Sequence, residues 1–301
     1  MEPTITPLDA TLGAVVTNLD LAALDEATWR SVEDAFHEYA ILVFPAQNLT
    51  EDAQNDFADR FGEIEYLRGD SDTKAVSITN QKIDGSVDVA DEHRFQIQRG
   101  NEGWHTDSSY MPLAAKASML SAQTVPSAGG ETEWADMRAA YDALDEDMKA
   151  RIADLSAHHS IYESQAKIGY TMATGAGYGF HTKGAPLRPL VKIHPVTGRK
   201  ALFIGRHAYS IPGFDRAEAK ALLDELVDFA CRAPRTYAHQ WQPGDLVVWD
   251  NRCVLHRAKP YDYAEPRSMR HTRVAGDPRS ELVATGRDER AADFIPSASN
   301  N

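Results

Sequence analysis

The chain has 301 residues, of which 43% are hydrophobic, and this is enough for one large domain with a substantial core. Its 45 acidic residues outnumber the 31 basic ones and give a formal net charge of −14, which repels nucleic-acid phosphates, and no stretch approaches the ~20 consecutive apolar residues that span a membrane. With two cysteines and no signal-peptide pattern at Met1–Thr4, we expect a cytoplasmic protein without a nucleic-acid or membrane partner.

Two helices are predicted in the first part of the chain from apolar side chains at helical spacing. The first leads directly into a buried strand at 41–44, which Pro45 ends, and its apolar positions are Trp29, Val32, Phe36 and Ala40. The second follows an N-cap within Asn48–Thr50 and ends at Gly62, and its apolar positions are Ala53, Phe57, Ala58 and Phe61. Both helices are expected to face the core.

A long polar segment, residues 69–100, follows the second helix. It is charged and has few apolar anchors apart from a short strand predicted at Ala75–Ile78. Loops of this length inside a domain are usually functional. Because the segment directly precedes the first string that carries chemistry, we predict that it is a mobile lid.

The rest of the chain alternates short strands with tight turns. Strands are predicted at 117–122, 131–134, 189–193, 201–204, 246–249 and 268–275. One helix starts at Asp136 and resumes after a break through Leu155, and another runs from the capping box of Asp215 and Glu218 to Pro234. We see no repeat or linker, so residues 1–301 are predicted to form a single, mainly β domain with flanking helices and a frayed tail at 278–301.

The string Trp104–Asp107 carries two potential metal ligands, His105 and Asp107. On an extended strand alternate side chains share a face, so these two point the same way. A second string, Trp249–His256, brings His256 after an apolar strand, where it completes the set. Two imidazoles and one carboxylate are typical of non-haem Fe(II) oxygenases, which leave about three positions of an octahedral ion open for a cosubstrate and O2.

Arg267 follows His256 by eleven residues. A dicarboxylate cosubstrate that chelates iron with one end needs a cation for its distal carboxylate, and the planar fork of arginine binds carboxylates in a bidentate manner. Thr132, on the strand after the Gly129–Gly130 turn, offers a hydroxyl to the same carboxylate. Taken singly, each residue has a structural alternative: a surface ion pair worth ~0 to 1 kcal/mol for Arg267, and strand propensity for Thr132.

Together these residues resemble a known family. The similar strings are Trp104–Ser108, Val125–Thr132, and Trp249–Arg252 continuing through His256 to Arg267, and they belong to a likeness that spans nearly the whole chain. The chain is identified by them as a member of the Fe(II)/2-oxoglutarate-dependent dioxygenases of the taurine dioxygenase and 2,4-D dioxygenase group. The resemblance implies that His105, Asp107 and His256 bind iron and that Arg267 and Thr132 hold 2-oxoglutarate. It also implies a double-stranded β-helix, or jelly roll, with helices outside.

Within that group the chain is most similar to aryloxyalkanoate dioxygenases, particularly those that act on (S)-phenoxypropionate herbicides such as dichlorprop. The strings that carry this likeness are Ala135–Tyr141, Pro186–Leu190 and Ile204–Ala208. The resemblance implies hydroxylation of a small organic acid beside its ether oxygen, followed by collapse to a phenol and an oxoacid. A dioxygenase for taurine-like sulfonates or other small anions is the alternative within the family.

The cation that binds the anionic substrate is left open by the sequence. The taurine-type pattern has an arginine fifteen residues after the distal histidine, where this chain has His271. Alternation along the strand favours His271 or Arg273, although Arg273 lies about 20 Å along a strand from Arg267, which argues against its reaching the same pocket. Arg206 and His207 are rival cations, and Asn101 lies four residues before His105, where related enzymes often contact substrate.

Two other kinds of protein remain as alternatives. A hydrolase can hold Zn in the same triad and activate a water, although no general base is evident near the ligands and Arg267 has no task in it. A jelly roll can also be a binding module without catalysis, because fold alone does not determine function. The sequence leaves open whether the protein forms a homo-oligomer.

Overall fold

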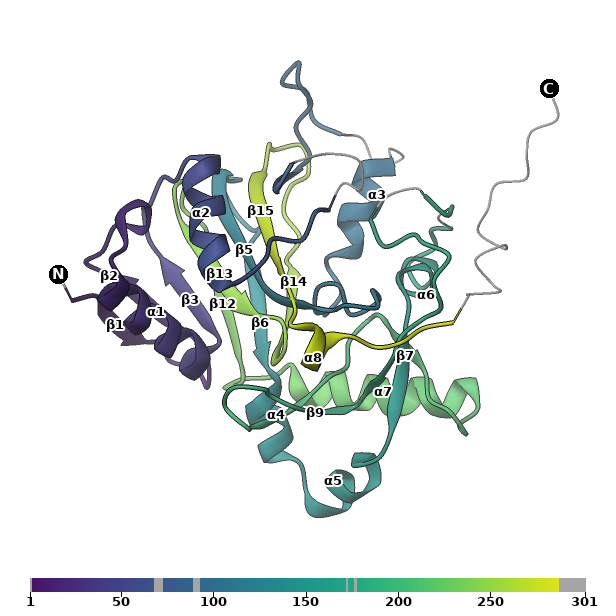
Figure 1. The fold of residues 1–301 in the computed structure, drawn as a ribbon. Helices are drawn as coiled ribbons and strands as arrows, with labels where there is room; N and C mark the ends of the chain where they lie inside the picture. The colour runs from purple at the N-terminus through teal and green to yellow at the C-terminus, as the bar shows by residue number, and fades with distance from the viewer. Residues whose placement is uncertain (1, 68–72, 89–92, 172, 176–177, 287–301) are drawn as a thin grey trace, which may run out of the picture.

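A seven-stranded sheet lies at the centre of the computed structural model, which describes residues 2–67, 73–88, 93–171, 173–175 and 178–286 (Figure 1). In spatial order its strands are β1 (Thr4–Pro7), β2 (Ala14–Thr17), β3 (Ile41–Phe44), β13 (Leu246–Asp250), β5 (Ala115–Thr124), β15 (Ser268–Ala275) and β4 (Ala75–Thr79). A three-stranded sheet has the order β12 (Thr236–His239), β6 (Thr132–Asp136) and β14 (Val254–Ala258). The protein is therefore mainly β with helices, as the sequence predicts.

Alternation along the strands gives the large sheet two different faces. On one face of β13, Leu246 and Val248 pack with the helices α1 (Glu26–Tyr39) and α2 (Glu51–Phe61). On the other face of the same strand, Val247 and Trp249 belong to the main core of the molecule. We call these the outer and the inner face of the large sheet.

The two predicted N-terminal helices exist and cover the outer face. Asp25 caps α1 by accepting a hydrogen bond from the Thr28 amide, and Thr50 caps α2 in the same way through Ala53. Their apolar sides meet in edge-to-face ring contacts, with the rings of Trp29 and Phe61 4.9 Å apart. Both helices pack where periodicity predicts.

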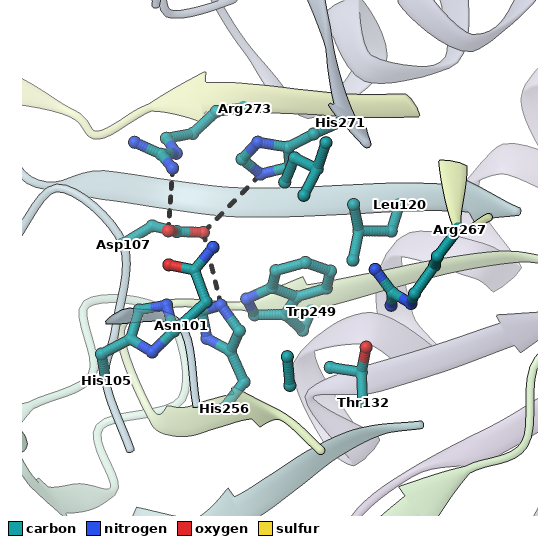
Figure 2. Close-up of a pocket in the computed structure, with 12 residues that line it drawn as sticks. Asn101, His105, Asp107, Leu120, Thr132, Trp249, His256, Arg267, His271 and Arg273 are labelled. Carbon is teal, nitrogen blue, oxygen red and sulfur yellow. Dashed lines mark hydrogen bonds and ion pairs between the residues drawn. The ribbon is translucent and has the colours of Figure 1, made fainter. Parts of the chain in front are cut away.

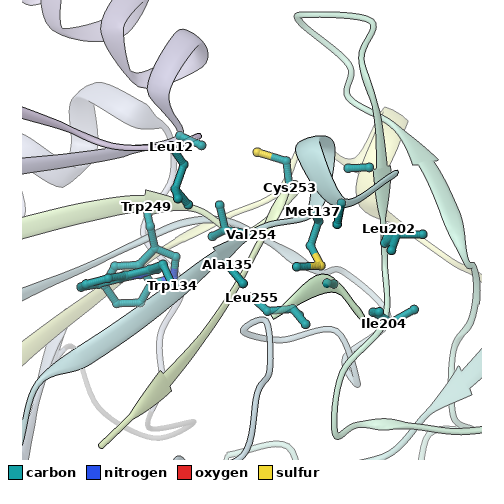
Figure 3. Packing of buried hydrophobic residues seen from close by; sticks show 14 of the residues in the cluster. Leu12, Trp134, Ala135, Met137, Leu202, Ile204, Trp249, Cys253, Val254 and Leu255 are labelled. Atoms are coloured by element: carbon teal, nitrogen blue, oxygen red, sulfur yellow. The ribbon is translucent and has the colours of Figure 1, made fainter. Parts of the chain in front are cut away.

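The main core lies on the inner face, between the large sheet and the helices α4 (Met137–Ala143) and α7 (Arg216–Ala230) (Figure 3). The indole rings of Trp134 on β6 and Trp249 on β13 lie 5.7 Å apart and join the two sheets. The predicted capping box of Asp215 and Glu218 is present at the start of α7. The strongly periodic helices of the C-terminal half are thus confirmed.

The remaining elements are short. They are η1 (Leu21–Ala23), α3 (His93–Gly100), α5 (Glu146–Ile152), β7 (Ser156–His159), α6 (Ile161–Ala166), β8 (Leu187–Pro189), β9 (Val191–Ile193), β10 (Lys200–Leu202), β11 (Ala208–Ser210) and α8 (Pro278–Glu281). They include two further small sheets, β11-β7-β8 and β10-β9. No helix in the described part of the chain combines the length and apolar character needed to cross a membrane.

The predicted lid, residues 69–100, contains more structure than the sequence indicates. Its strand exists as β4, which pairs with β15, and its last residues form α3, which was not predicted. The end of α3 is held in place because the Arg206 guanidinium donates to the Gly100 carbonyl. Residues 69–72 and 89–92 of this segment lie outside the described residues, and its mobility stays a prediction.

The predicted frayed tail, 278–301, needs a correction at its start. Residues 278–281 form α8, and Glu281 is almost completely buried. The Glu281 carboxylate pairs with Lys192, and its backbone carbonyl accepts from Arg188 at 3.2 Å. These contacts hold the chain four residues beyond the predicted boundary, while residues 287–301 lie outside the described part.

Candidate active site

Two side chains from one short string and a third about 150 residues further along the chain converge between the large sheet and the β12-β6-β14 sheet. Ligand atoms of His105, Asp107 and His256 all lie within 4.8 Å of one another, and all three residues are buried (Figure 2). His105 and His256 are joined directly through their backbones, with N···O distances of 2.9 and 2.7 Å in the two directions. The structure thus brings together the triad that the sequence predicts.

The local structure around Asp107 differs from the predicted strand. Only His105 takes part in a β-bridge, and Asp107 begins a turn in which Ser108 has a φ of 53°. The Asp107 amide and the Trp249 indole both donate to the amide oxygen of Asn251, at 3.2 and 3.1 Å. Asn251 therefore holds Asp107 in place where a strand ladder does not.

The two oxygens of Asp107 have different partners. Oδ2 accepts from the Ser118 hydroxyl at 2.6 Å and lies 3.8 Å from Nε2 of His256, so this oxygen faces the imidazoles. Oδ1 accepts from Nη2 of Arg273 at 2.8 Å. Burial raises the pKa of the Asp107 carboxyl, but Arg273 and the neighbouring imidazoles outweigh it and hold that pKa well below its usual range. Asp107 is therefore an anion that offers one oxygen to a metal.

The two histidines are oriented by different means. Nδ1 of His105 lies 2.8 Å from the Gly103 carbonyl, so we assign the proton to Nδ1, which leaves Nε2 with a lone pair for a metal. The ring of His256 packs on Trp249 with 4.7 Å between centroids, and its Nδ1 has no hydrogen-bond partner among the described residues. Packing rather than a hydrogen bond thus orients His256.

Metal binding is expected to release almost no protons near neutral pH. Burial lowers the pKa of His105 to about 4 and that of His256 well below its usual value, so both imidazoles are neutral between pH 6 and 8. We therefore expect the affinity for Mn(II) to vary by less than about twofold over this range and to fall only when the pH approaches the lowered pKa values. Calorimetry in two buffers with different ionisation enthalpies measures the protons released. One proton or more per Mn(II) at pH 7 would contradict the prediction.

Arg267 is a buried cation without an acidic partner among the residues that the structure describes. It is 7% exposed, and its Nε donates to the Gly130 carbonyl at 3.2 Å. Burial lowers the pKa of its guanidinium, as expected for a charge that lacks a counter-charge. Thr132 lies in the same pocket, and its hydroxyl oxygen accepts from the Trp241 indole, which leaves the hydroxyl proton free to donate. The pair is suited to a carboxylate ligand.

One pocket connects this cation to the triad. It is lined by Ile78, Asn101, His105, Asp107, Leu120, Thr132, Trp249, His256, Ala258, Arg267, His271 and Arg273. The expectation that Arg273 is too far along β15 to reach the pocket of Arg267 is wrong, because the pocket runs along the inner face of that strand. Arg267, directly before β15, and Arg273, near the end of that strand, therefore contribute to one site.

The five predicted substrate residues are separated by the structure. Asn101, His271 and Arg273 line the pocket, whereas Arg206 lines a different cleft beside Trp104. The guanidinium of Arg206 donates to backbone carbonyls on α3 and α6. His207 lies behind His105, with 5.8 Å between ring centroids, and its Nδ1 bonds to Ser164. Arg206 and His207 support the site from outside the pocket lining.

A second group of potential metal ligands, His194, Asp250 and Cys253, lies in the core. Its ligand atoms are engaged in contacts within the protein. Asp250 accepts from Nε and Nη2 of Arg252 at 2.8 and 2.6 Å and lies 2.9 Å from Nε2 of His194. Burial raises the pKa of the neighbouring Cys253 thiol, which therefore stays protonated. Because both carboxylate oxygens are occupied, this group does not fit a metal.

Four residues that the sequence analysis did not select contact the site. Ser118 and Asn251 bond to Asp107, and Glu65 and Tyr178 surround Arg273. Two of them had a signal in the sequence: Ser118 is a polar residue on the inner-facing register of a buried strand, and Asn251 lies within the Trp249–Arg252 string. Glu65 and Tyr178 come from loops, and no pattern in the sequence pointed to them.

A site with two imidazoles and one carboxylate, facing an open pocket, defines a non-haem metal-dependent enzyme. A model of the taurine catabolism dioxygenase TauD, TfdA family matches residues 4–274, and the chain belongs to this family. The resemblance seen in the sequence is thereby confirmed.

Similar proteins point the same way. The chain is 53% identical to an (S)-phenoxypropionate/alpha-ketoglutarate-dioxygenase of Sphingobium herbicidovorans. The match covers 93% of this chain and 97% of that enzyme. It is 38% identical, over 90% and 97%, to an alpha-ketoglutarate-dependent 2,4-dichlorophenoxyacetate dioxygenase of Cupriavidus pinatubonensis. A crystal structure of AAD-2 in complex with Mn(II) and N-oxalylglycine matches with a TM-score of 0.82 and 38% identity, covering 92% of this chain and 98% of that one.

Proposed function

We propose that the protein is an Fe(II)/2-oxoglutarate-dependent dioxygenase that hydroxylates a small organic acid, an aryloxyalkanoate that then divides into a phenol and an oxoacid. The observation that carries the proposal is the combination of a buried facial triad with Arg267, a buried cation that lacks an acidic partner within the described residues. A metal alone accounts for the triad but leaves Arg267 unexplained. A dicarboxylate cosubstrate accounts for both.

The proposed fold is a double-stranded β-helix that comprises the whole chain, residues 1–301, as one domain. It is supported by the position of the site, which receives side chains from the inner face of the large sheet and from β6 and β14 of the smaller sheet. Two sheets that face each other around a central site are typical of this architecture.

Each part of the pocket has a defined task in this chemistry. His105, Asp107 and His256, which line the pocket, would hold the iron. Arg267 binds the distal carboxylate of 2-oxoglutarate, and Thr132 donates its hydroxyl proton to the same group. When bound, iron with 2-oxoglutarate and O2 supplies the oxidising chemistry of C–H hydroxylation, and 2-oxoglutarate leaves as succinate and CO2.

The function is tested by measuring succinate release with Fe(II), ascorbate and 2-oxoglutarate. A panel of aryloxypropionates, aryloxyacetates and sulfonates should identify substrates that stimulate release, and aryloxypropionates should stimulate it most. Strongest stimulation by a sulfonate would favour the taurine-like alternative. Zn-dependent hydrolysis without succinate would favour the hydrolase, and no uptake of Fe(II) or 2-oxoglutarate in calorimetry would favour a binding module.

The anionic substrate is proposed to lie at the Arg273 end of the pocket. Arg273 on β15 is the cation that lines this end, and His271, whose pKa is lowered by burial, lines it as a neutral imidazole stacked on Trp249 at an interplanar angle of 9°. Figure 2 shows the amide of Asn101 on the same side of the pocket as the metal ligands. Arg206 and His207 are proposed to act on the substrate only through the elements that they hold.

Asn101→Ala is expected to raise KM for the anionic substrate about tenfold or more, because a hydrogen bond to a charged group contributes ~1.5–3 kcal/mol. Asn101 lines the pocket, and its bonds to Gln98 and Ala258 are made by its backbone, so alanine keeps them. Asn101→Asp keeps the shape, adds a like charge and should raise KM further. Steady-state kinetics with 2-oxoglutarate as the varied substrate is the control, since its KM should change by less than about twofold. An unchanged substrate KM in both variants would remove Asn101 from the site.

We also propose that the enzyme acts in the cytoplasm, without a nucleic-acid or membrane partner. The described cysteines, Cys231 and Cys253, are both free thiols, which suits a reducing compartment. The net charge of −14 disfavours nucleic acid. Gel filtration with light scattering determines whether the chain forms a homo-oligomer.

A further inference from the structure

Arg273 lies in a buried cage beside the metal site. Its Nη2 donates to Oδ1 of Asp107 at 2.8 Å, and its Nη1 donates to the Ser108 hydroxyl at 3.0 Å. The ring of Tyr178 covers its guanidinium at 5.5 Å. Nε of Arg273 has no hydrogen-bond partner among the described residues and lies 3.9 Å from Oε2 of Glu65, within ion-pair range. Arg273 is therefore shared between two carboxylates.

Glu65 is held in this position by its own hydrogen bonds. The Tyr178 hydroxyl donates to Oε1, and the Ser108 hydroxyl donates to Oε2 at 2.9 Å. The side chain of Glu65 is only 15% exposed. Glu65 comes from the segment after α2 and Tyr178 from the loop after α6, so two loops meet at the guanidinium.

The charges explain why a second carboxylate is needed. A metal dication on Oδ2 of Asp107 competes with Arg273 for the charge of that carboxylate, and it adds repulsion to a buried guanidinium. Among the described residues, Asp107 and Glu65 are the carboxylates that form ion pairs with Arg273, at 2.8 and 3.9 Å. Once Asp107 binds the metal, Glu65 supplies the remaining counter-charge.

We propose that Glu65, fixed by Tyr178, is a positioning residue for the metal centre. It balances the charge of Arg273, and through Arg273 it keeps Oδ1 of Asp107 turned away from the metal while Oδ2 faces it. The inference rests on the metal site of the proposed function and adds to it two residues that touch neither metal nor cosubstrate. Outer partners of this kind contribute about 10- to 100-fold to metal affinity.

The first test measures the Mn(II) affinity of the purified apoprotein by calorimetry. Glu65→Gln should weaken binding about tenfold, and Tyr178→Phe, which keeps the ring over Arg273, should weaken it about threefold. Tyr162→Phe is the matched control, because its hydroxyl bonds the same loop at Thr174 and His181 without reaching the cage. The Mn(II) affinity of this control should stay within about twofold of wild type.

Two results of this test would overturn the proposal. One is wild-type Mn(II) affinity in Glu65→Gln and Tyr178→Phe. The other is an equal loss in Tyr162→Phe, which would assign the effect to the loop as a whole. Circular dichroism confirms folding, and if Glu65→Gln does not fold, Tyr178→Phe alone decides the test.

A double-mutant cycle tests whether Glu65 acts through Arg273. Glu65→Gln is compared in the wild-type background and in Arg273→Gln, where the guanidinium that Glu65 balances is gone. Its effect on Mn(II) affinity should shrink to about twofold or less in the second background. An undiminished effect would show that Glu65 acts independently of Arg273 and would overturn the proposal. Failure of the metal site itself is distinguishable, because His256→Ala would then bind Mn(II) like wild type.

Discussion

Replacement of His256 by alanine is expected to abolish turnover by removing the metal. The imidazole is one of the three proposed protein ligands; the backbone of His256 bonds to that of His105, and its ring packs on Trp249. Loss of an outer partner already costs 10- to 100-fold in metal affinity, so loss of a ligand should exceed about 100-fold. Mn(II) calorimetry and succinate release measure the two effects separately.

His158→Ala is the matched control for this variant. His158 lies on β7, its Nδ1 is 3.2 Å from the Ser210 hydroxyl, and it does not line the pocket. We expect wild-type metal binding and turnover from it. Wild-type rates in His256→Ala would refute the metal assignment.

Replacement of Arg267 by alanine should weaken 2-oxoglutarate binding by about 2–5 kcal/mol, which is about 30-fold to several thousand-fold, because a buried carboxylate loses its charged partner. Arg267 has no acidic partner in the described structure, so its removal leaves no carboxylate of the protein unpaired. Titration of the Mn(II)-loaded protein with 2-oxoglutarate measures the loss. Pyruvate, which has the oxoacid group but no distal carboxylate, should bind both forms with similar affinity.

Arg270→Ala, three residues after Arg267, is the control for the loss of 2-oxoglutarate affinity. Arg270 is on the outer face of β15 and donates to the Leu49 carbonyl at 2.9 Å. We expect its 2-oxoglutarate affinity to match wild type. If Arg267→Ala also matched wild type, Arg267 would have no part in the site.

The helices of the fold were predictable where one apolar side packs on the core. The periodicity of Trp29 and Phe36 in α1 reflects the outer face that this helix covers. The helix α3 lacks such a stripe, because its residues are largely polar. Its end is fixed instead by Arg206, which lies 106 residues further along the chain. No local pattern reports a contact of that separation.

The convergence of the three candidate ligands was predictable, although the reason for their arrangement was not. A strand was expected to align His105 and Asp107, whereas the structure uses a β-bridge at His105 and a turn held by Asn251. The position of Arg273 was misjudged because distance along one strand says little about the length of the pocket beside it. Side-chain contacts between loops, such as Glu65 with Tyr178, leave no periodic trace in the sequence.

The paired backbones of His105 and His256 have a consequence for how the protein acquires its ion. Since main-chain bonding already fixes two of the three donors side by side, folding itself assembles the chelate, and the ordering cost does not fall on the capture step. We therefore expect the ion to leave and return while the polypeptide keeps its shape. Such a site is preorganised, whereas small zinc domains fold only when they bind their metal.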